Sequence, residues 1–199
     1  MRHIRKTTAL LLALCLLFAL GACGNGSGSE TEQQSVPASG GAAGGDFDFP
    51  DIRFFTATTL EGEQMEAEDL FGDYDVTVIN FWATWCPPCL SEMDDLAGFQ
   101  KTLPENVQMI LFCIDGQTHE EECRDILADC GYEGLSLMDG DGDMHTLLNQ
   151  MQYIPTTLFV DSRGGQLSDG IVGASTDLAN AYKEQINAGL KAQSKSEWK

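Results

Sequence analysis

Two almost wholly apolar runs and several helix-like repeats predict the order of structural elements after residue 47. Residues 76–82 and 107–114 are the apolar runs, which are typical of strands buried on both faces of a sheet. After the first run, apolar residues recur at helical spacing as far as about residue 103. The other expected elements are helices at 66–71, 119–130, 143–151 and from 175 onward, and strands at 135–138, 156–161 and 166–172.

Turn and capping residues indicate where these elements begin and end. Residues 56–60 and 63–65 have the pattern of a hairpin around Glu61-Gly62, and 162–165 has the pattern of a second turn. Helix starts are expected at Thr118, Asp143 and Ser175, and helix ends at Gly72 and Gly131. The whole order predicts an α/β fold, in which helices flank a central mixed sheet that carries an added N-terminal hairpin.

The first 46 residues have a different composition from the rest of the chain. Residues 1–6 are basic and residues 7–20 are apolar, which is too short for a membrane span of about 20 residues and typical of a signal peptide. The stretch 24–45 is rich in Gly, Ser and Ala, as flexible linkers are. We expect a signal peptide at 1–22, a linker segment at 23–46 and the folded domain at 47–199.

Leu20-Gly21-Ala22-Cys23 resembles the bacterial lipoprotein box. The resemblance implies that Cys23 becomes the lipid-modified N-terminus after cleavage, so that the domain is tethered to a membrane. The alternative is an ordinary signal peptide cleaved at a nearby small residue.

The chain is strongly acidic, with a formal net charge of −20. This charge argues against nucleic acid and anionic lipid headgroups as electrostatic partners. A well-solvated acidic surface is the simplest interpretation.

The stretch Trp85-Cys86-Pro87-Pro88-Cys89 lies where the first apolar run gives way to the helix pattern. Two residues separate the sulfurs, which is the spacing of a thioredoxin-type redox pair. A helix N-terminus stabilises a thiolate, so we expect Cys86 to be the nucleophile and Cys89 the resolving thiol. Pro87 and Pro88 stiffen the loop and offer no N–H groups.

The stretch Asn80–Cys89, together with Glu92 and with Ile154-Pro155-Thr156-Thr157, resembles the TlpA/ResA group of thioredoxin-like, extracytoplasmic thiol–disulfide oxidoreductases. The similarity covers about 47–190 and implies a thioredoxin-like fold. By this resemblance Pro155 matches a cis-proline beside the two cysteines. The substrate-binding residues that it implies are Trp85, Pro87, Pro88, Ile154, Pro155 and Thr156.

Two further positions follow from the same resemblance. Asn80 stands where cytoplasmic thioredoxins have a buried aspartate, which favours the extracytoplasmic subgroup. Glu92 matches an acid near the active site, and we hypothesise that it is catalytic, moving the proton of Cys89 as the mixed disulfide resolves. The alternative is an ordinary acid stabilised by the helix dipole.

The resemblance also implies an activity, a location and partners. The expected enzyme is a thiol–disulfide oxidoreductase, lipid-anchored on the outer face of the cytoplasmic membrane, that reduces disulfides of exported proteins such as apocytochrome c. Its electrons would come from a membrane thiol donor of the CcdA/DsbD type. No metal or organic cofactor is expected, because the disulfide itself carries the two electrons.

Two alternative activities make different demands on the sequence. A peroxiredoxin-like peroxidase would place its cysteine in a P-x-x-x-T-x-x-C pattern, which is absent here. A Sco-type copper chaperone would space its cysteines by three residues and add a histidine. Neither pattern fits the chain as well as the oxidoreductase does.

Three more cysteines lie in the predicted domain. Cys113 falls in an apolar run and is expected to be a core thiol. Cys123 and Cys130 would be about 10.5 Å apart along an intact helix, too far for a disulfide, unless Cys130 lies beyond the helix end. None of them has the paired spacing of a zinc site. Residues 139–143 begin like a calcium loop but lack its later Gly and Glu, so a polar turn before a helix is expected.

Overall fold

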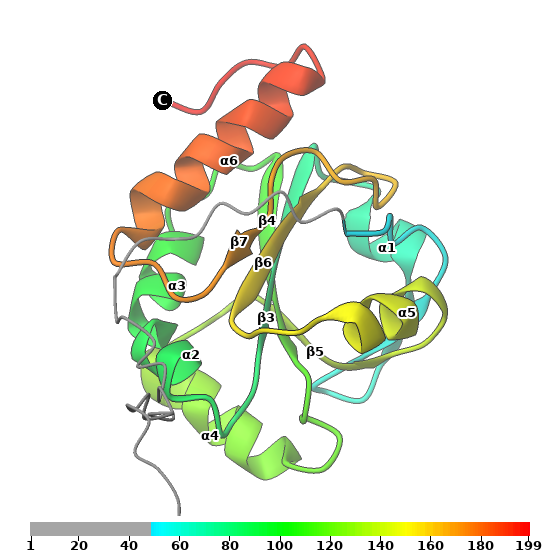
Figure 1. Ribbon diagram of the computed structural model, residues 1–199, viewed down its shortest axis with the longest axis vertical. Coiled ribbons are helices and arrows are strands. Elements are labelled where there is room, and N and C mark those ends of the chain that lie inside the picture. Colours follow the sequence, from blue (N-terminus) through cyan, green and yellow to red (C-terminus); the bar gives the residue numbers. More distant parts are fainter. Residues whose placement is uncertain (1–48) are drawn as a thin grey trace, which may run out of the picture. The chain divides into compact units, whose positions relative to one another are not determined.

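The strand formed by the first apolar run lies in the interior of the sheet, with a strand on each side. The computed structural model describes residues 49–199, which hold a seven-stranded sheet in the order β2-β1-β5-β4-β3-β6-β7 (Figure 1). β3 (Val76–Trp82) pairs in parallel with β4 (Val107–Cys113) and antiparallel with β6 (Thr156–Val160). Every residue of β3 is buried, as its unbroken apolar run predicts.

The outer strands make the sheet mixed. β5 (Leu135–Gly140) is parallel to β4, and β1 (Thr56–Thr59) is antiparallel to both β5 and β2 (Gln64–Glu66). The predicted N-terminal hairpin therefore exists and extends one edge of the sheet. β7 (Ile171–Val172) completes the other edge by pairing antiparallel with β6.

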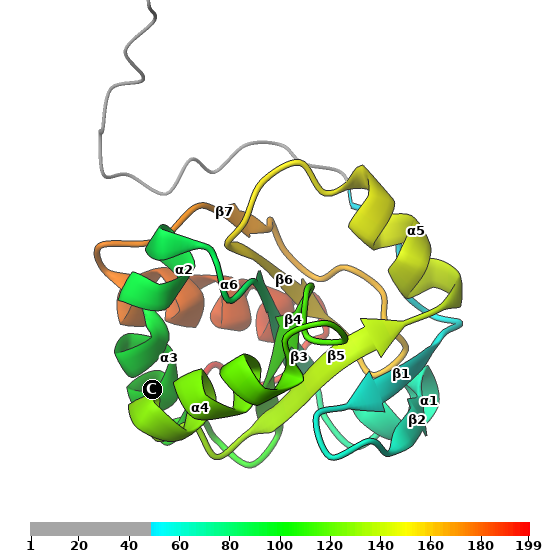
Figure 2. The ribbon, with the colours of Figure 1, turned by 90° about the horizontal axis from the view of Figure 1, so that it is seen from below.

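Helices cover both faces of the sheet (Figures 1 and 2). One face carries α2 (Pro87–Ser91), α3 (Met93–Gln100), α4 (Glu120–Cys130) and α6 (Leu178–Ala192), and the other carries α1 (Ala67–Phe71) and α5 (Gly142–Gln150). Successive side chains of a strand point to opposite faces, so β3 supplies Val78 and Trp82 to the first core and Ile79 and Phe81 to the second. The redox motif lies on the first face, where β3 meets α2.

The single helix predicted after residue 86 is broken in two. Glu92 ends α2 and precedes α3, with φ −106° and ψ 0°, outside the helical range. The break is accompanied by a buried Glu92 side chain that accepts a hydrogen bond from Asn80 of β3. A tertiary hydrogen bond thus fixes a conformation that the helical spacing could not predict.

The three predicted helix starts are each displaced by one or two residues. α4 starts after His119 rather than Thr118, α5 after Asp141 rather than Asp143, and α6 after Asp177 rather than Ser175. The Asp143 carboxylate instead accepts hydrogen bonds from the backbone N–H groups of Arg53 and Phe54, because the N-terminal segment packs against it. The predicted helix ends hold. Gly131 adopts the left-handed φ of 69° after α4, and Gly72 follows α1.

The strand predicted at 166–172 is mostly wrong. Only Ile171 and Val172 form a strand, and Gln166 makes an isolated bridge to Val160. The Gln166 N–H donates to the carboxylate of Asp51 at 3.1 Å, and the Ile52 N–H donates to the Gly164 carbonyl at 2.9 Å. Asp51 and Ile52 of the N-terminal segment therefore bind backbone groups of Gln166 and Gly164 that a regular hairpin would have paired between its own strands.

Several sequence predictions lie outside the described residues. They are the signal peptide at 1–22, the lipid-modified Cys23, the linker at 23–46 and the first residues of the domain. Among residues 49–199, no helix has both the length and the apolar character needed to span a bilayer.

Candidate active site

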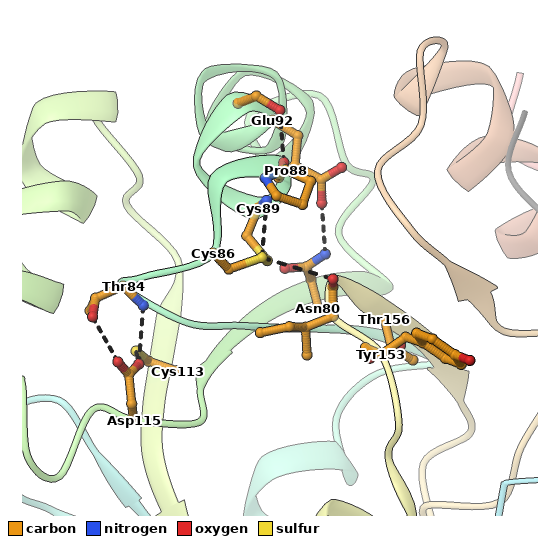
Figure 3. Close-up of a disulfide and its surroundings, with 12 residues drawn as sticks. Asn80, Thr84, Cys86, Pro88, Cys89, Glu92, Cys113, Asp115, Tyr153 and Thr156 are labelled. Carbon is orange, nitrogen blue, oxygen red and sulfur yellow. Dashed lines mark hydrogen bonds between the residues drawn. A yellow bond between two sulfur atoms is a disulfide. The ribbon is translucent and has the colours of Figure 1, made fainter. Parts of the chain in front are cut away.

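Cys86 and Cys89 form a disulfide at the junction of β3 and α2, with Cα atoms 5.3 Å apart (Figure 3). Cys86 is the residue that caps α2, and Cys89 lies inside its first turn. The Cys89 N–H points at Cys86 Sγ, 3.3 Å away. A helix N–H directed at a sulfur stabilises negative charge there, so an opened disulfide would hold its thiolate on Cys86.

Pro87 and Pro88 begin α2. Proline suits the start of a helix because its fixed φ is helical and its missing N–H would have had no partner within the helix. Cys89 consequently provides the first N–H of the helix, which is the one that faces Cys86. The local sequence therefore determines both the start of α2 and the donor that the sulfur meets.

The loop before β6 lies beside the sulfurs. The Ile154–Pro155 peptide bond is cis, and the Ile154 carbonyl oxygen lies 3.8 Å from Cys86 Sγ. The structure thus places these two residues next to the cysteines, as the sequence predicted. Thr156 is buried, and its hydroxyl donates to the Tyr153 carbonyl at 2.7 Å, which closes the turn below Pro155.

Two aromatic side chains stand exposed beside the disulfide. Trp85 is 64% exposed and Tyr153 is 60% exposed, although large apolar side chains are usually buried. They flank a groove of about 430 Å³ that α5 and the loop after it also line. The other groove residues include Ile114, Leu148 and Met151. The sequence predicted Trp85 as a residue of this site but not Tyr153 or α5, because no local pattern links α5 to the redox motif.

Glu92 is a buried acid close to the disulfide, with 4% of its surface exposed. The Asn80 side-chain N–H group donates to Glu92 Oε1 at 3.2 Å and also faces Thr157 Oγ1 at 3.0 Å and the Tyr182 hydroxyl at 3.1 Å. An amide nitrogen has two hydrogens, so the three acceptors compete for them. The sequence did not predict the part of this network contributed by Tyr182 on α6.

Burial raises the pKa of Glu92 to about 7. Hydrogen bonds from Asn80 and from the Ser175 backbone N–H oppose this rise in the pKa, and the charge of Asp95 adds to it. A carboxyl group with a pKa near neutral pH can both release and accept a proton under physiological conditions. A pKa in this range fits the hypothesis that Glu92 moves the proton of Cys89.

Asp115 anchors the loop that leads into the redox motif (Figure 3). Its carboxylate accepts hydrogen bonds from the Thr84 N–H at 3.1 Å and from the Thr84 hydroxyl at 2.7 Å. Burial opposes ionisation, but these bonds and one from the Cys113 thiol outweigh it, so the pKa of Asp115 lies below its ordinary value. Sequence reasoning missed Asp115, because 31 residues separate it from Thr84.

Metal ligation has no support in the part of the chain that the structure describes. No three His, Cys, Asp or Glu side chains converge there as ligands. His119 and His145 lie on separate elements, and the 139–143 segment forms the end of β5 and the start of α5.

Comparison with known proteins agrees with this geometry. Residues 48–165 match the model of the AhpC/TSA family. The Thioredoxin-like protein YneN of Bacillus subtilis is 29% identical over 122 residues, which cover 61% of this chain and 69% of YneN. The Thiol-disulfide oxidoreductase ResA of Bacillus thuringiensis is 28% identical over 138 residues, which cover 69% of this chain and 73% of ResA.

A solved structure also shares the fold. The crystal structure of StoA from Bacillus subtilis superposes with a TM-score of 0.54 at 19% sequence identity, covering 68% of this chain and 98% of StoA. The fold is therefore thioredoxin-like, with the mixed sheet and flanking helices that the sequence predicted.

Proposed function

We propose that this chain, which belongs to the AhpC/TSA family and is a thiol–disulfide oxidoreductase of thioredoxin-like fold, reduces disulfides of exported proteins outside the cytoplasmic membrane. The observation that carries the proposal is the Cys86–Cys89 pair at a helix start, beside the Ile154 carbonyl and the exposed Trp85. Exchange at such a pair needs no other cofactor, because the sulfurs carry both electrons.

The reaction begins with both cysteines reduced. The Cys86 thiolate attacks one sulfur of the substrate disulfide, and the other substrate sulfur leaves as a thiolate and takes up a proton. Cys89 then attacks Cys86 Sγ, which re-forms the Cys86–Cys89 disulfide and releases the second substrate thiol. The substrate gains two electrons and two protons, and the enzyme loses them.

The two cysteines have different roles because their environments differ. Cys86 caps α2 and lies next to the Ile154 carbonyl, whereas Cys89 is fully buried inside the first turn. The Cys89 thiol must lose its proton before it can attack. Glu92, with a pKa of about 7, accepts that proton in this mechanism.

The substrate chain is proposed to bind over Trp85, Pro87 and Pro88 on one side and over Ile154, Pro155 and Thr156 on the other. The exposure of Trp85 and Tyr153 supports this, since their rings offer apolar contact area for a protein partner. Substrates with a cysteine next to an apolar side chain would fit the groove best. Apocytochrome c, the target that the TlpA/ResA resemblance implies, is one candidate among exported proteins.

Location and electron supply rest on the N-terminal sequence. A signal peptide at 1–22, a lipid on Cys23 and a linker at 23–46 would hold the domain 47–199 at the outer face of the membrane. A membrane thiol donor of the CcdA/DsbD type would then reduce Cys86–Cys89 after each cycle. A Cys23→Ala variant of the full chain is expected to leave the membrane fraction, and retention of that variant in the membrane would refute the lipid anchor.

Trapping of the mixed disulfide tests the activity. The full-length Cys89→Ala variant is expected to stall with a substrate bound through Cys86, and the adducts should be exported cysteine-containing proteins released by dithiothreitol. The matched control is Cys86→Ala with Cys89→Ala, which should trap nothing. Absence of adducts, or peroxide consumption in place of disulfide reduction by the wild-type chain, would overturn the proposal.

A further inference from the structure

A tight turn between β3 and α2 carries Trp85. The Cys86 N–H donates to the Ala83 carbonyl at 3.1 Å, so Thr84 and Trp85 are the two central residues of this turn. Thr84 is 4% exposed, whereas Trp85 is 64% exposed. With most of its surface in solvent, Trp85 takes its orientation from the backbone of the turn rather than from side chains packed around it.

Asp115 binds the buried side of this turn. Its Oδ1 accepts the Thr84 N–H at 3.1 Å, and its Oδ2 accepts the Thr84 hydroxyl at 2.7 Å (Figure 3). The N–H of the second residue of a β-turn has no partner within the turn, and a buried N–H without a partner is costly. Asp115 therefore satisfies that group from outside the turn and fixes both the backbone and the side chain of Thr84.

Asp115 itself lies in a loop whose shape is fixed. Its carbonyl accepts the N–H groups of Thr118 and His119, both at 3.1 Å, and the Gly116 N–H donates to the Cys113 carbonyl at 3.1 Å. Gly116 packs so closely on β5 that an added Cβ atom would lie 2.6 Å from a methionine side chain of that strand. The carboxylate is thus held in place by its own loop, independently of the turn that it binds.

We propose that Asp115 is a positioning residue that acts through Thr84 to hold Trp85 in place for binding protein substrates. This inference rests on the proposed function and adds to it a determinant of substrate affinity that lies outside the groove. Without Asp115 the turn can move, and Trp85 spends less time in the orientation that a substrate contacts. Cys86 is held separately as the residue that caps α2, so exchange with a small disulfide does not depend on Asp115.

The test measures, for full-length variants, the KM for insulin and the rate with a small aromatic disulfide. Asp115→Leu removes both acceptors and should raise the KM for insulin by up to about tenfold, the effect expected for loss of the Trp85 ring. The kcat with insulin and the rate with the small disulfide should stay unchanged. In a Trp85→Ala background, Asp115→Leu should cause no further rise in KM, because its effect is transmitted through that ring.

Two further variants separate positioning from a general loss of stability. Asp115→Asn keeps an oxygen for the Thr84 N–H and offers an N–H to the Thr84 hydroxyl, so its KM should be close to that of the wild type. Asp161→Leu is the matched control, since Asp161 also accepts two backbone N–H groups, from Arg163 and Gly165 at 2.8 Å each. That turn follows β6 beside the far end of β3, so Asp161→Leu should lower the unfolding free energy and leave the KM unchanged.

The inference is overturned if Asp115→Leu has the KM of the wild type, or if it raises KM equally with and without the Trp85 ring. Thr84→Val loses only the hydroxyl bond, so it should raise KM by a smaller factor with the same dependence on Trp85. It supplies the same comparison if Asp115→Leu does not fold. A wild-type chain that does not reduce insulin would instead overturn the proposed function, and this inference with it.

Discussion

Glu92, of which only 4% is exposed, accepts a hydrogen bond from the side chain of Asn80 at 3.2 Å. The two residues join the redox helix to β3, so the protonation of Glu92 is coupled to the core of the protein. Burial favours the neutral acid, while the bond from Asn80 favours the carboxylate. Their balance puts the pKa of Glu92 at about 7, and the first three predictions depend on it.

The rate at which the mixed disulfide resolves should depend on Glu92. In the wild type, we expect this rate to rise through an inflection near pH 7, as Glu92 becomes able to accept the Cys89 proton. Glu92→Gln should lose the inflection and be slower by about 10²-fold, which is typical for loss of a general base. The measurement is stopped-flow exchange across pH 5–9, with the exposed Asp94→Asn on α3 as control. Identical profiles for Glu92→Gln and wild type would exclude Glu92 from the reaction.

The unfolding free energy should also change with pH as Glu92 gains or loses its proton. The folded-state pKa of about 7 lies above the ordinary value of 4.5, so the stabilisation from neutral Glu92 is complete below pH 4.5 and is lost as the pH rises to 7. Relative to Glu92→Gln, the oxidised wild type should lose up to about 3 kcal/mol of unfolding free energy over that range. Urea unfolding of both proteins at several pH values measures this, and parallel pH dependences would contradict it.

Tyr182 should influence the pKa of Glu92 through Asn80. The Tyr182 hydroxyl pairs with Thr157 Oγ1 at 2.6 Å and accepts from Asn80 at 3.1 Å. In Tyr182→Phe, the Asn80 hydrogens are left to Thr157 and Glu92, so the Glu92 carboxylate is better stabilised and its pKa falls below 7. The lost hydrogen bonds should cost about 1–3 kcal/mol of unfolding free energy.

Tyr132→Phe is the matched control for this substitution. Tyr132 is partly buried, and its hydroxyl donates to the Met109 carbonyl at 2.7 Å and not to the Asn80–Glu92 network. Tyr132→Phe should lower the unfolding free energy by a similar amount and leave unchanged the pH at which the exchange rate has its inflection. The role assigned to Tyr182 fails if both variants shift the inflection equally, or if neither does.

The exposed rings of Trp85 and Tyr153 should matter for protein substrates only. Trp85→Ala and Tyr153→Ala are each expected to slow reduction of insulin disulfides by about tenfold, which is the effect of losing roughly 1.4 kcal/mol of contact. Reduction of a small aromatic disulfide should be unchanged, and so should the unfolding free energy, because both side chains are mostly exposed. Phe54→Ala is the control, since Phe54 is 79% exposed and lies outside this groove. Equal slowing of both substrates would argue against a docking role.

The redox motif could be predicted from the sequence because its chemistry is local. Two prolines start α2, Cys86 caps it, and Cys89 lies within its first turn, all of which depend on five consecutive residues. The central strands were predictable for a similar reason, since a run such as 76–82 can bury every side chain only inside a sheet covered on both faces.

The errors of sequence reasoning fall where distant segments compete for hydrogen bonds. Asp143 was expected to cap a helix, but its carboxylate accepts hydrogen bonds from the N–H groups of Arg53 and Phe54, which are 90 and 89 residues away in the sequence. The break at Glu92 has the same kind of cause, because Asn80 lies on a different element. Local propensity cannot register a partner whose position depends on the whole fold.

By itself, the sequence determined the α/β architecture through its hydrophobic periodicity and the Cys86–Cys89 pair through short-range backbone preferences, and the resemblance of its motifs to the TlpA/ResA group added the thioredoxin-like fold. Only the tertiary structure decided that Asn80 meets Thr157 and Tyr182, which are 77 and 102 residues away, and that Asp115 meets Thr84, which is 31 residues away. These contacts require strands and helices to be packed before the side chains come within reach. The physical reason is that burial and hydrogen-bond competition are properties of the folded core, not of any stretch of chain.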